Sequence, residues 1–156
     1  MIDFIIEKAK TVCFSGHRTL EKDFNKLALC NEIIRLIETG YDTFLVGMAV
    51  GFDTECFRML YELKNKNDIK IIACIPCLNQ SERFNSFQKA EYDKMLTQAD
   101  EKIVLSEKYH SKCMQIRNEF MVDNASVLVS YLRKDYGGTK NTVKYAEKVN
   151  CKIIRL

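Results

Sequence analysis

The sequence predicts an α/β fold in three layers, with a mainly parallel sheet of about six strands between two layers of helices. The strand-like segments are short and continuously apolar, as expected of strands that are buried on both faces. Segments with helical spacing of apolar residues separate them, and this alternation of strand and helix is typical of parallel sheets. The 156 residues are enough for one core, so we expect a single domain over residues 1–156.

The first two predicted elements are a strand and a helix. Residues 11–15 (TVCFS) form an apolar run that ends at Gly16. Residues 21–39 place apolar side chains at helical spacing, and Gly40 follows them, where glycine commonly ends a helix.

The middle of the chain predicts two further strand–helix pairs. Residues 43–48 (TFLVGM) form the second strand, and a helix covers about residues 53–64. The third strand lies within residues 68–76 and stops at the only proline of the chain, and residues 86–99 form the next helix.

The last third of the chain completes the pattern. Strands are predicted at residues 102–105, 126–132 and 151–155, with helices at residues 112–124 and 139–149 between them. Because the long loops follow strands, we expect them at the carboxyl edge of the sheet, where open α/β sheets bind ligands.

Composition and charge exclude several classes of protein. The net charge is only +3 and the basic residues are dispersed, so a nucleic-acid partner is an alternative that the charge does not favour. With no signal peptide and no apolar run of bilayer length, we expect a cytoplasmic protein without a membrane partner.

The seven cysteines are then expected to be reduced and mostly buried. The Cys74–Cys77 spacing lacks a second pair that would complete a metal site, which leaves a redox role as its alternative, and we expect neither a metal nor a required cofactor.

The turn after the fifth strand predicts a phosphate-binding site. Gly137 and Gly138 lead into a helix whose first turn carries the hydroxyls of Thr139 and Thr142 and the side chain of Lys140. Free N–H groups and the positive end of the helix dipole favour an anion there. The alternative is a plain helix start with Thr139 as its N-cap.

The turn after the first strand carries Ser15, Gly16, His17 and Arg18. Glycine lets a ligand approach the backbone closely, and arginine can hold a phosphate through two hydrogen bonds. The alternative is a tight turn with a solvated arginine and a histidine that bonds locally. The turn is not the G-x-G-x-x-G fingerprint, so a nicotinamide or flavin has no support.

Two further segments complete the candidate site. Gly47 and Gly51 bracket the end of the second strand and would make room for a sugar or base, while Asp53 would order the loop or bond a ribose hydroxyl. For Asp53 we favour the alternative role of helix N-cap. Arg117 and Asn118 lie in a helix before the fifth strand and would close the site on an anionic ligand if that helix begins over the strand ends.

In their order, these four segments resemble the SLOG superfamily of Rossmann-like nucleotide-binding domains, and in particular its small YpsA-like proteins. They are S-G-H-R, G-M-A-V-G-F-D, R-N and G-G-T-K-N-T-V-K-Y-A, and the resemblance runs from about residue 11 to the C-terminus. It implies a Rossmann-like fold that binds a nucleotide or a nucleotide-derived molecule such as an ADP-ribose-like compound. It is also compatible with a homo-oligomer.

Two related families suggest alternative functions for this chain. The core domain of DNA-processing protein A has similar turns, which implies a single-strand nucleic-acid-binding accessory protein as one alternative. The Lonely Guy phosphoribohydrolases carry a catalytic glutamate where this chain has Thr142. Since a hydroxyl cannot replace a carboxylate as a base or in stabilising an oxocarbenium-like centre, we expect binding without turnover, with an N-glycosidase as the enzymatic alternative.

Overall fold

The protein contains one six-stranded sheet, and the computed structural model describes residues 4–156. The strand order is β4-β3-β2-β1-β5-β6, and every neighbouring pair is parallel. The strands are β1 (Thr11–Gly16), β2 (Thr43–Val46), β3 (Lys70–Ile75), β4 (Glu101–Val104), β5 (Val127–Tyr131) and β6 (Lys152–Arg155). The predicted parallel α/β fold is thus confirmed.

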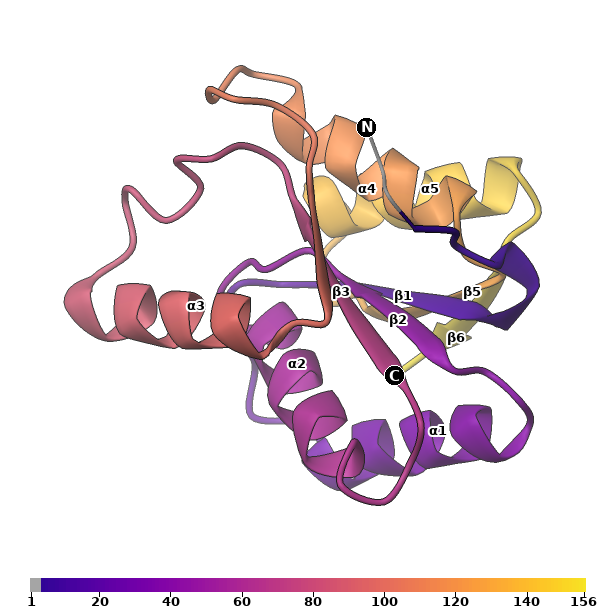
Figure 1. Ribbon diagram of the computed structural model, residues 1–156. Coiled ribbons are helices and arrows are strands. Elements are labelled where there is room, and N and C mark those ends of the chain that lie inside the picture. Colours follow the sequence, from indigo (N-terminus) through magenta and orange to yellow (C-terminus); the bar gives the residue numbers. More distant parts are fainter. Residues whose placement is uncertain (1–3) are drawn as a thin grey trace.

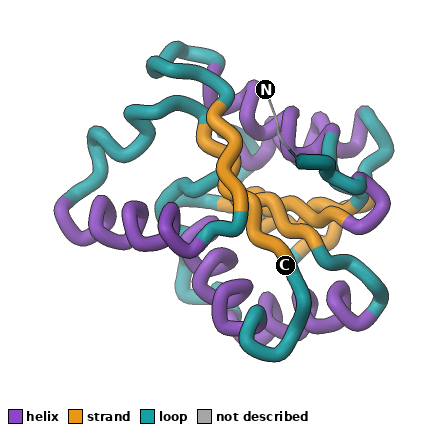
Figure 2. The backbone as a smooth tube through the Cα atoms, viewed as in Figure 1, coloured by secondary structure: helices purple, strands orange, loops and turns teal. Residues whose placement is uncertain are grey.

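Helices cover both faces of this sheet, as Figures 1 and 2 show. The helices are α1 (Lys26–Glu38), α2 (Phe52–Leu63), α3 (Ser86–Gln98), α4 (Cys113–Asp123) and α5 (Gly138–Lys148), with a short 3₁₀ turn at Lys8–Lys10. One buried cluster joins the sheet to α1, α2 and α3, and a second joins it to α4 and α5. The architecture therefore has the predicted three layers.

The first helix is shorter than its apolar spacing predicts. Asn25 accepts a hydrogen bond from the Ala28 N–H (3.1 Å) and caps α1, so the helix begins at Lys26 and not near residue 21. The preceding segment is held differently, because the Glu21 N–H donates to the Tyr131 hydroxyl (3.1 Å). This bond ties the loop after β1 to the end of β5.

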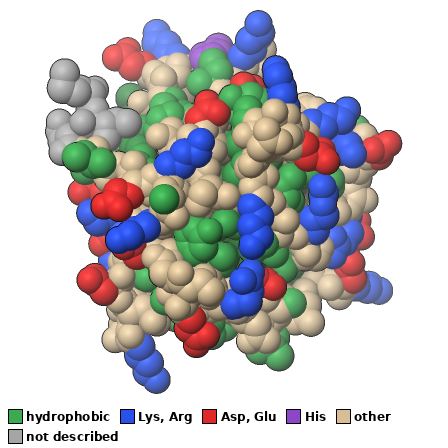
Figure 3. All heavy atoms as spheres, turned by 90° about the vertical axis from the view of Figure 1, so that its right-hand side faces the viewer, with side chains coloured by type: hydrophobic (Ala, Val, Ile, Leu, Met, Phe, Trp, Pro, Cys, Tyr) green, Lys and Arg blue, Asp and Glu red, His purple; other side chains and the backbone are tan. Residues whose placement is uncertain are grey.

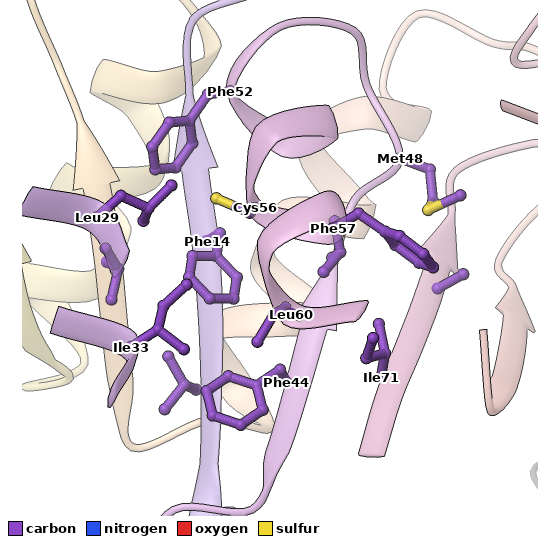
Figure 4. Close-up of a cluster of buried hydrophobic side chains, with 14 of the residues drawn as sticks. Phe14, Leu29, Ile33, Phe44, Met48, Phe52, Cys56, Phe57, Leu60 and Ile71 are labelled. Carbon is purple, nitrogen blue, oxygen red and sulfur yellow. The ribbon is translucent and has the colours of Figure 1, made fainter. Parts of the chain in front are cut away.

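Aromatic packing fixes the start of α2 against the end of β1. Phe14 lies between Phe44 and Phe52, with ring centroids 6.2 and 6.5 Å away, and Figure 4 shows these side chains pointing into one cluster. Burying each such ring stabilises the fold by about 2–3 kcal/mol. The loops that leave β1 and enter α2 are therefore held at a fixed distance.

The strand order places a switch point between β1 and β5. The loop after β1 leads to α1 on one face, whereas the loop after β5 leads to α5 on the other. Two neighbouring loops that diverge in this way leave a crevice between them, which is where open parallel sheets bind ligands. Both of the turns singled out most strongly by the sequence lie here.

Figure 3 shows another face of the molecule, turned by 90° from the view of Figure 1. Acidic and basic side chains are interspersed there, as the small net charge suggests. Within residues 4–156, no helix is both long and apolar enough to cross a membrane.

Candidate functional site

A cavity of about 340 Å³ occupies the switch point. It collects ten of the thirteen residues that the sequence predicts for the site: Ser15, Gly16, His17, Arg18, Asp53, Arg117, Asn118, Gly137, Gly138 and Thr139. Gly47, Gly51 and Thr142 do not line it. That these residues bind a ligand stays a prediction, but all four predicted segments contribute residues to one cavity.

The N-terminus of α5 opens into this cavity without a capping side chain. Gly137 occupies the N-cap position at φ +96°, a backbone conformation that favours glycine. The first backbone N–H to bond back is that of Asn141, which donates to the Gly137 carbonyl at 3.0 Å. The N–H groups of the first helical turn are therefore available to an anion.

Thr139 and Thr142 differ in what their hydroxyls can do. Thr139 lines the cavity as the second residue of α5, so it is not the N-cap. Thr142 is buried and its hydroxyl donates to the Gly138 carbonyl at 2.8 Å. The expectation that Thr142 contacts the phosphate is therefore corrected: its hydroxyl is used to brace the first turn of the helix. Lys140 also points elsewhere, to an ion pair with Asp135 (3.3 Å).

Two serines occupy neighbouring positions near the carboxyl ends of β1 and β5. Ser15 of β1 and Ser130 of β5 are register partners, so their side chains lie on the same face of the sheet, the face that α4 and α5 cover. Ser15 lines the cavity. The buried Ser130 hydroxyl has no hydrogen-bond partner among the described residues, and such a group costs roughly 1–3 kcal/mol. Ser130 was not predicted, because it stands within an otherwise apolar strand.

His17 presents one nitrogen to the protein. Its Nε2 accepts a hydrogen bond from the Arg133 N–H at 2.8 Å, so the neutral ring carries its proton on Nδ1. Burial, followed by the nearby Lys134 charge, lowers the pKa of His17 from its ordinary value. The local hydrogen bond that we considered for His17 is thus present, and Nδ1–H remains as a donor.

Arg117 and Asn118 form the buried wall of the cavity. Arg117 Nε donates to Asn118 Oδ1 at 2.7 Å, and Arg117 Nη1 donates to the Gly47 carbonyl. Its Nη2 has only a sulfur contact, to Met114 Sδ at 3.9 Å, among the described residues. Arg117 keeps its charge, and Nη2 is therefore the nitrogen with donors to spare for an anion.

Asp53 orders the loop before α2 and does not cap the helix. Gly51 holds the N-cap position, while Asp53 Oδ2 accepts a hydrogen bond from the Ala49 N–H at 3.1 Å. The favoured N-cap role was wrong because the positive φ of Gly51 starts the helix two residues earlier. Burial raises the pKa of Asp53 to about 6, against the opposing effect of the Arg117 charge.

The glycines of this region make room for the protein's own atoms. A Cβ on Gly47 would lie 2.8 Å from Arg117 Nη1 and 3.0 Å from Asp53 Oδ2. The space beside Gly51 is filled by the Arg18 backbone, with its Cα 2.7 Å from the added Cβ. Beside Gly16 it is filled by the Phe52 side chain. These three glycines are therefore needed for packing, while Gly16 also lines the cavity, and the approach of a ligand to them stays a prediction.

Arg18 stands at the open side of the cavity. Its side chain is exposed and forms no ion pair with any of the described residues. Lys134 and Tyr136, which lie in the loop between β5 and α5, complete this rim, with the Lys134 ammonium 6.0 Å from the Tyr136 ring centroid. Neither was predicted, although a basic residue in the same strand-to-helix turn as Gly137 was a usable signal.

The remaining candidates lie away from the cavity. All seven cysteines are free, and five of them, including Cys74 and Cys77, are buried. Burial raises the pKa of Cys74 to about 12 and that of Cys77 as well, which makes both poor thiolates. The second histidine of the chain, His110, is exposed.

Comparison with known proteins gives one family and several relatives. The YpsA family model, described as the YspA SLOG family, matches residues 8–154. The uncharacterized SPbeta prophage-derived protein YoqJ of Bacillus subtilis (strain 168) is 32% identical over 135 residues, which are 78% of this chain and 78% of YoqJ.

Two solved structures share the fold at low sequence identity. DNA processing protein A (DprA) from Streptococcus pneumoniae superposes with a TM-score of 0.69 at 20% identity, over 95% of this chain and 50% of that one. DNA processing protein A from Helicobacter pylori, described with a unique single-stranded DNA binding mode, gives a TM-score of 0.69 at 14% identity, over 95% and 65% of the two chains. This chain thus spans half to two thirds of those proteins.

Proposed function

This chain belongs to the YspA SLOG family, and from that premise we propose that it binds a nucleotide or a nucleotide-derived molecule, such as an ADP-ribose-like compound, without converting it. The phosphate lies at the N-terminus of α5, and the rest of the ligand extends along the carboxyl edge of the sheet.

The observation that carries this proposal is the uncapped start of α5 inside a cavity with a basic lining. Three cationic side chains, those of Arg18, Arg117 and Lys134, line that cavity, whereas Asp53 is its one acidic residue in the described part of the chain. An anion at this point would accept hydrogen bonds from the first helical turn and gain from the helix dipole and from the surrounding charge.

Turnover is disfavoured by the same residues. The Thr142 hydroxyl is occupied by the Gly138 carbonyl and replaces the glutamate expected of a phosphoribohydrolase. Asp53, the one carboxyl group among the described residues that line the cavity, has its Oδ2 bonded to the Ala49 N–H. Incubating the protein with nucleoside monophosphates and assaying for free base tests the enzymatic alternative, and base release would contradict binding alone.

A single-strand nucleic acid is the second candidate ligand. The fold shared with the Helicobacter pylori protein favours it, and the small net charge argues against it. Binding of this kind depends steeply on salt because it releases counterions. A gel shift or anisotropy assay at low salt, repeated at rising salt, tests it, and no binding at low salt removes it.

Thermal denaturation with a nucleotide panel tests the main proposal. A ligand that binds the native state at a hundred times its Kd stabilises it by about 2.7 kcal/mol, which raises the Tm by several degrees. We expect at least one nucleotide or ADP-ribose to do so at millimolar concentration. An unchanged Tm across the panel would contradict the proposal.

A further inference from the structure

A second and larger hollow adjoins the cavity of about 340 Å³ at the start of α5, which we call the phosphate cavity. It has a volume of about 910 Å³ and lies between the loops that follow β3 and β4, residues 76–85 and 105–112. Figure 1 shows both loops leaving the sheet at one edge, on the way to α3 and α4. The hollow shares Arg18, Ala49 and Met114 with the phosphate cavity, so the two lie next to each other.

The lining of this hollow differs in charge from that of the phosphate cavity. Besides Arg18, it has two basic residues, Arg83 and Lys108, and two acidic ones, Glu82 and Glu107. A near balance of charge gives no preference for a second phosphate. The hollow therefore suits an uncharged part of a ligand.

Aromatic and amide side chains in the hollow indicate which uncharged group of a ligand it would bind. Tyr109 is 62% exposed although it lines the hollow, and Phe84 packs edge-on against Tyr92, with ring centroids 5.7 Å apart. The amides of Asn79 and Gln88 lie among them. Asn79 is engaged at both ends of its amide and Gln88 Oε1 accepts from the Asn85 N–H, so Gln88 Nε2 is the amide donor left for a ligand among the described residues. An exposed ring beside such a donor is suited to a flat heterocycle, which stacks on the ring and accepts a hydrogen bond from the amide.

The two loops are held in place before any ligand arrives. The Tyr109 N–H donates to Asn79 Oδ1 at 3.1 Å, and the Leu78 N–H donates to the Glu107 carbonyl at 3.3 Å. Gln80 Nε2 donates to the Gly47 carbonyl at 3.0 Å, the same oxygen that Arg117 Nη1 bonds. A hydrogen-bond network thus connects the hollow rigidly to the wall of the phosphate cavity.

We propose that this hollow is the base subsite of the same ligand, in which Tyr109 stacks on the nucleobase while the phosphate lies at α5. This rests on the proposed function, and it identifies the ligand class as a nucleoside joined to phosphate, either free or within a nucleic-acid strand. Arg18, at the junction, lies between the two parts.

Calorimetric titration of the full chain separates the two subsites. The probes are inorganic pyrophosphate, the four common nucleoside diphosphates, and a short single-stranded DNA. We expect at least one nucleotide to bind about tenfold more tightly than pyrophosphate, because a stacked base contributes that much. Tyr109→Ala should remove this gain and leave the affinity for pyrophosphate unchanged. Tyr61→Ala, a half-exposed tyrosine on α2 outside both hollows, is the matched control and should change neither.

The outcomes distinguish the base subsite from the proposed function. If nucleotides bind no more tightly than pyrophosphate, or if Tyr109→Ala leaves nucleotide affinity intact, the base subsite is wrong and phosphate binding stands. If only the DNA binds and Tyr109→Ala weakens it, the subsite holds with a strand as the source of the base. If no probe binds, both the subsite and the proposed function are overturned.

Discussion

Asp53 is the residue at which burial and charge act most directly against each other. Its carboxyl group is buried beside Arg117, and burial raises its pKa to about 6. In the unfolded chain the group ionises near its ordinary value of 3.8, so between these two pH values the native state holds the extra proton. The contribution of Asp53 to stability is therefore complete below about pH 4 and is lost as the pH rises through about 6.

Asp53→Asn should remove this pH dependence. The amide keeps an oxygen for the Ala49 N–H and does not ionise. The free energy of unfolding of the variant, relative to the natural protein, should therefore rise by roughly 3 kcal/mol between about pH 4 and pH 7. Urea denaturation at both pH values measures it, and a difference that does not vary with pH would show that burial does not control this group.

Gly51 and Gly40 allow backbone strain to be separated from steric exclusion. Both have positive φ, +83° and +110°, but only Gly51 has the Arg18 backbone against the position of a Cβ. We expect Gly40→Ala to destabilise by roughly 1–2 kcal/mol through strain alone.

Gly51→Ala should destabilise by about 3 kcal/mol or more, because strain and overpacking add. Denaturant midpoints of the two variants give the comparison. Equal losses would mean that the turn of His17 and Arg18 can move away from α2 without cost.

At the level of the elements, the proposed binding of phosphate at the start of α5 can be tested by a substitution that does not disturb the fold. A Cβ on Gly138 would meet no atom within 4 Å, and the residue has no positive φ. Gly138→Ala should therefore leave the stability of the free protein unchanged or raise it by about 0.4–1 kcal/mol.

The same methyl group would stand at the wall of the phosphate cavity. We expect Gly138→Ala to weaken the binding of pyrophosphate and of nucleotides together, by about tenfold. Calorimetry on the folded variant measures this, and an unchanged affinity would place the phosphate elsewhere.

The sequence predicted the elements well because their signals are local. Short apolar runs predicted a strand at each of the six positions, and a helix was predicted at each of the five helical positions. The start of α1 was missed because the Asn25 cap outweighs apolar spacing that continues before it. Such boundaries depend on single hydrogen bonds, which spacing does not reveal.

The candidate site was predicted in its location but not in its contacts. Turns after strands must meet at one edge of a parallel sheet, so Ser15 to Arg18 and Gly137 to Thr139 could be brought together from the sequence. The atoms beside a glycine belong to residues that are distant in the sequence. At Gly16, for example, they belong to the Phe52 side chain. For the same reason the Thr142 hydroxyl could not be known to face the Gly138 carbonyl.

For the whole molecule, the strand order explains why the candidate site residues lie at one edge of the sheet. The order β4-β3-β2-β1-β5-β6 brings the loops after β1, β2 and β5 and the helix α4 around one crevice, and the loops after β3 and β4 extend it. The aromatic cluster around Phe14 holds β1 and α2 in position beneath it. A ligand would then bind to a site that is largely formed in advance.

The most direct test of phosphate binding at α5 is a nuclear magnetic resonance titration of the ¹⁵N-labelled protein with nucleoside diphosphates. Hydrogen bonds from the first helical turn to a phosphate would shift the amide resonances of Gly138, Thr139 and Lys140 most strongly, and this is the result we predict. Unchanged resonances for these three amides, while the protein binds the nucleotide elsewhere or not at all, would contradict the central claim.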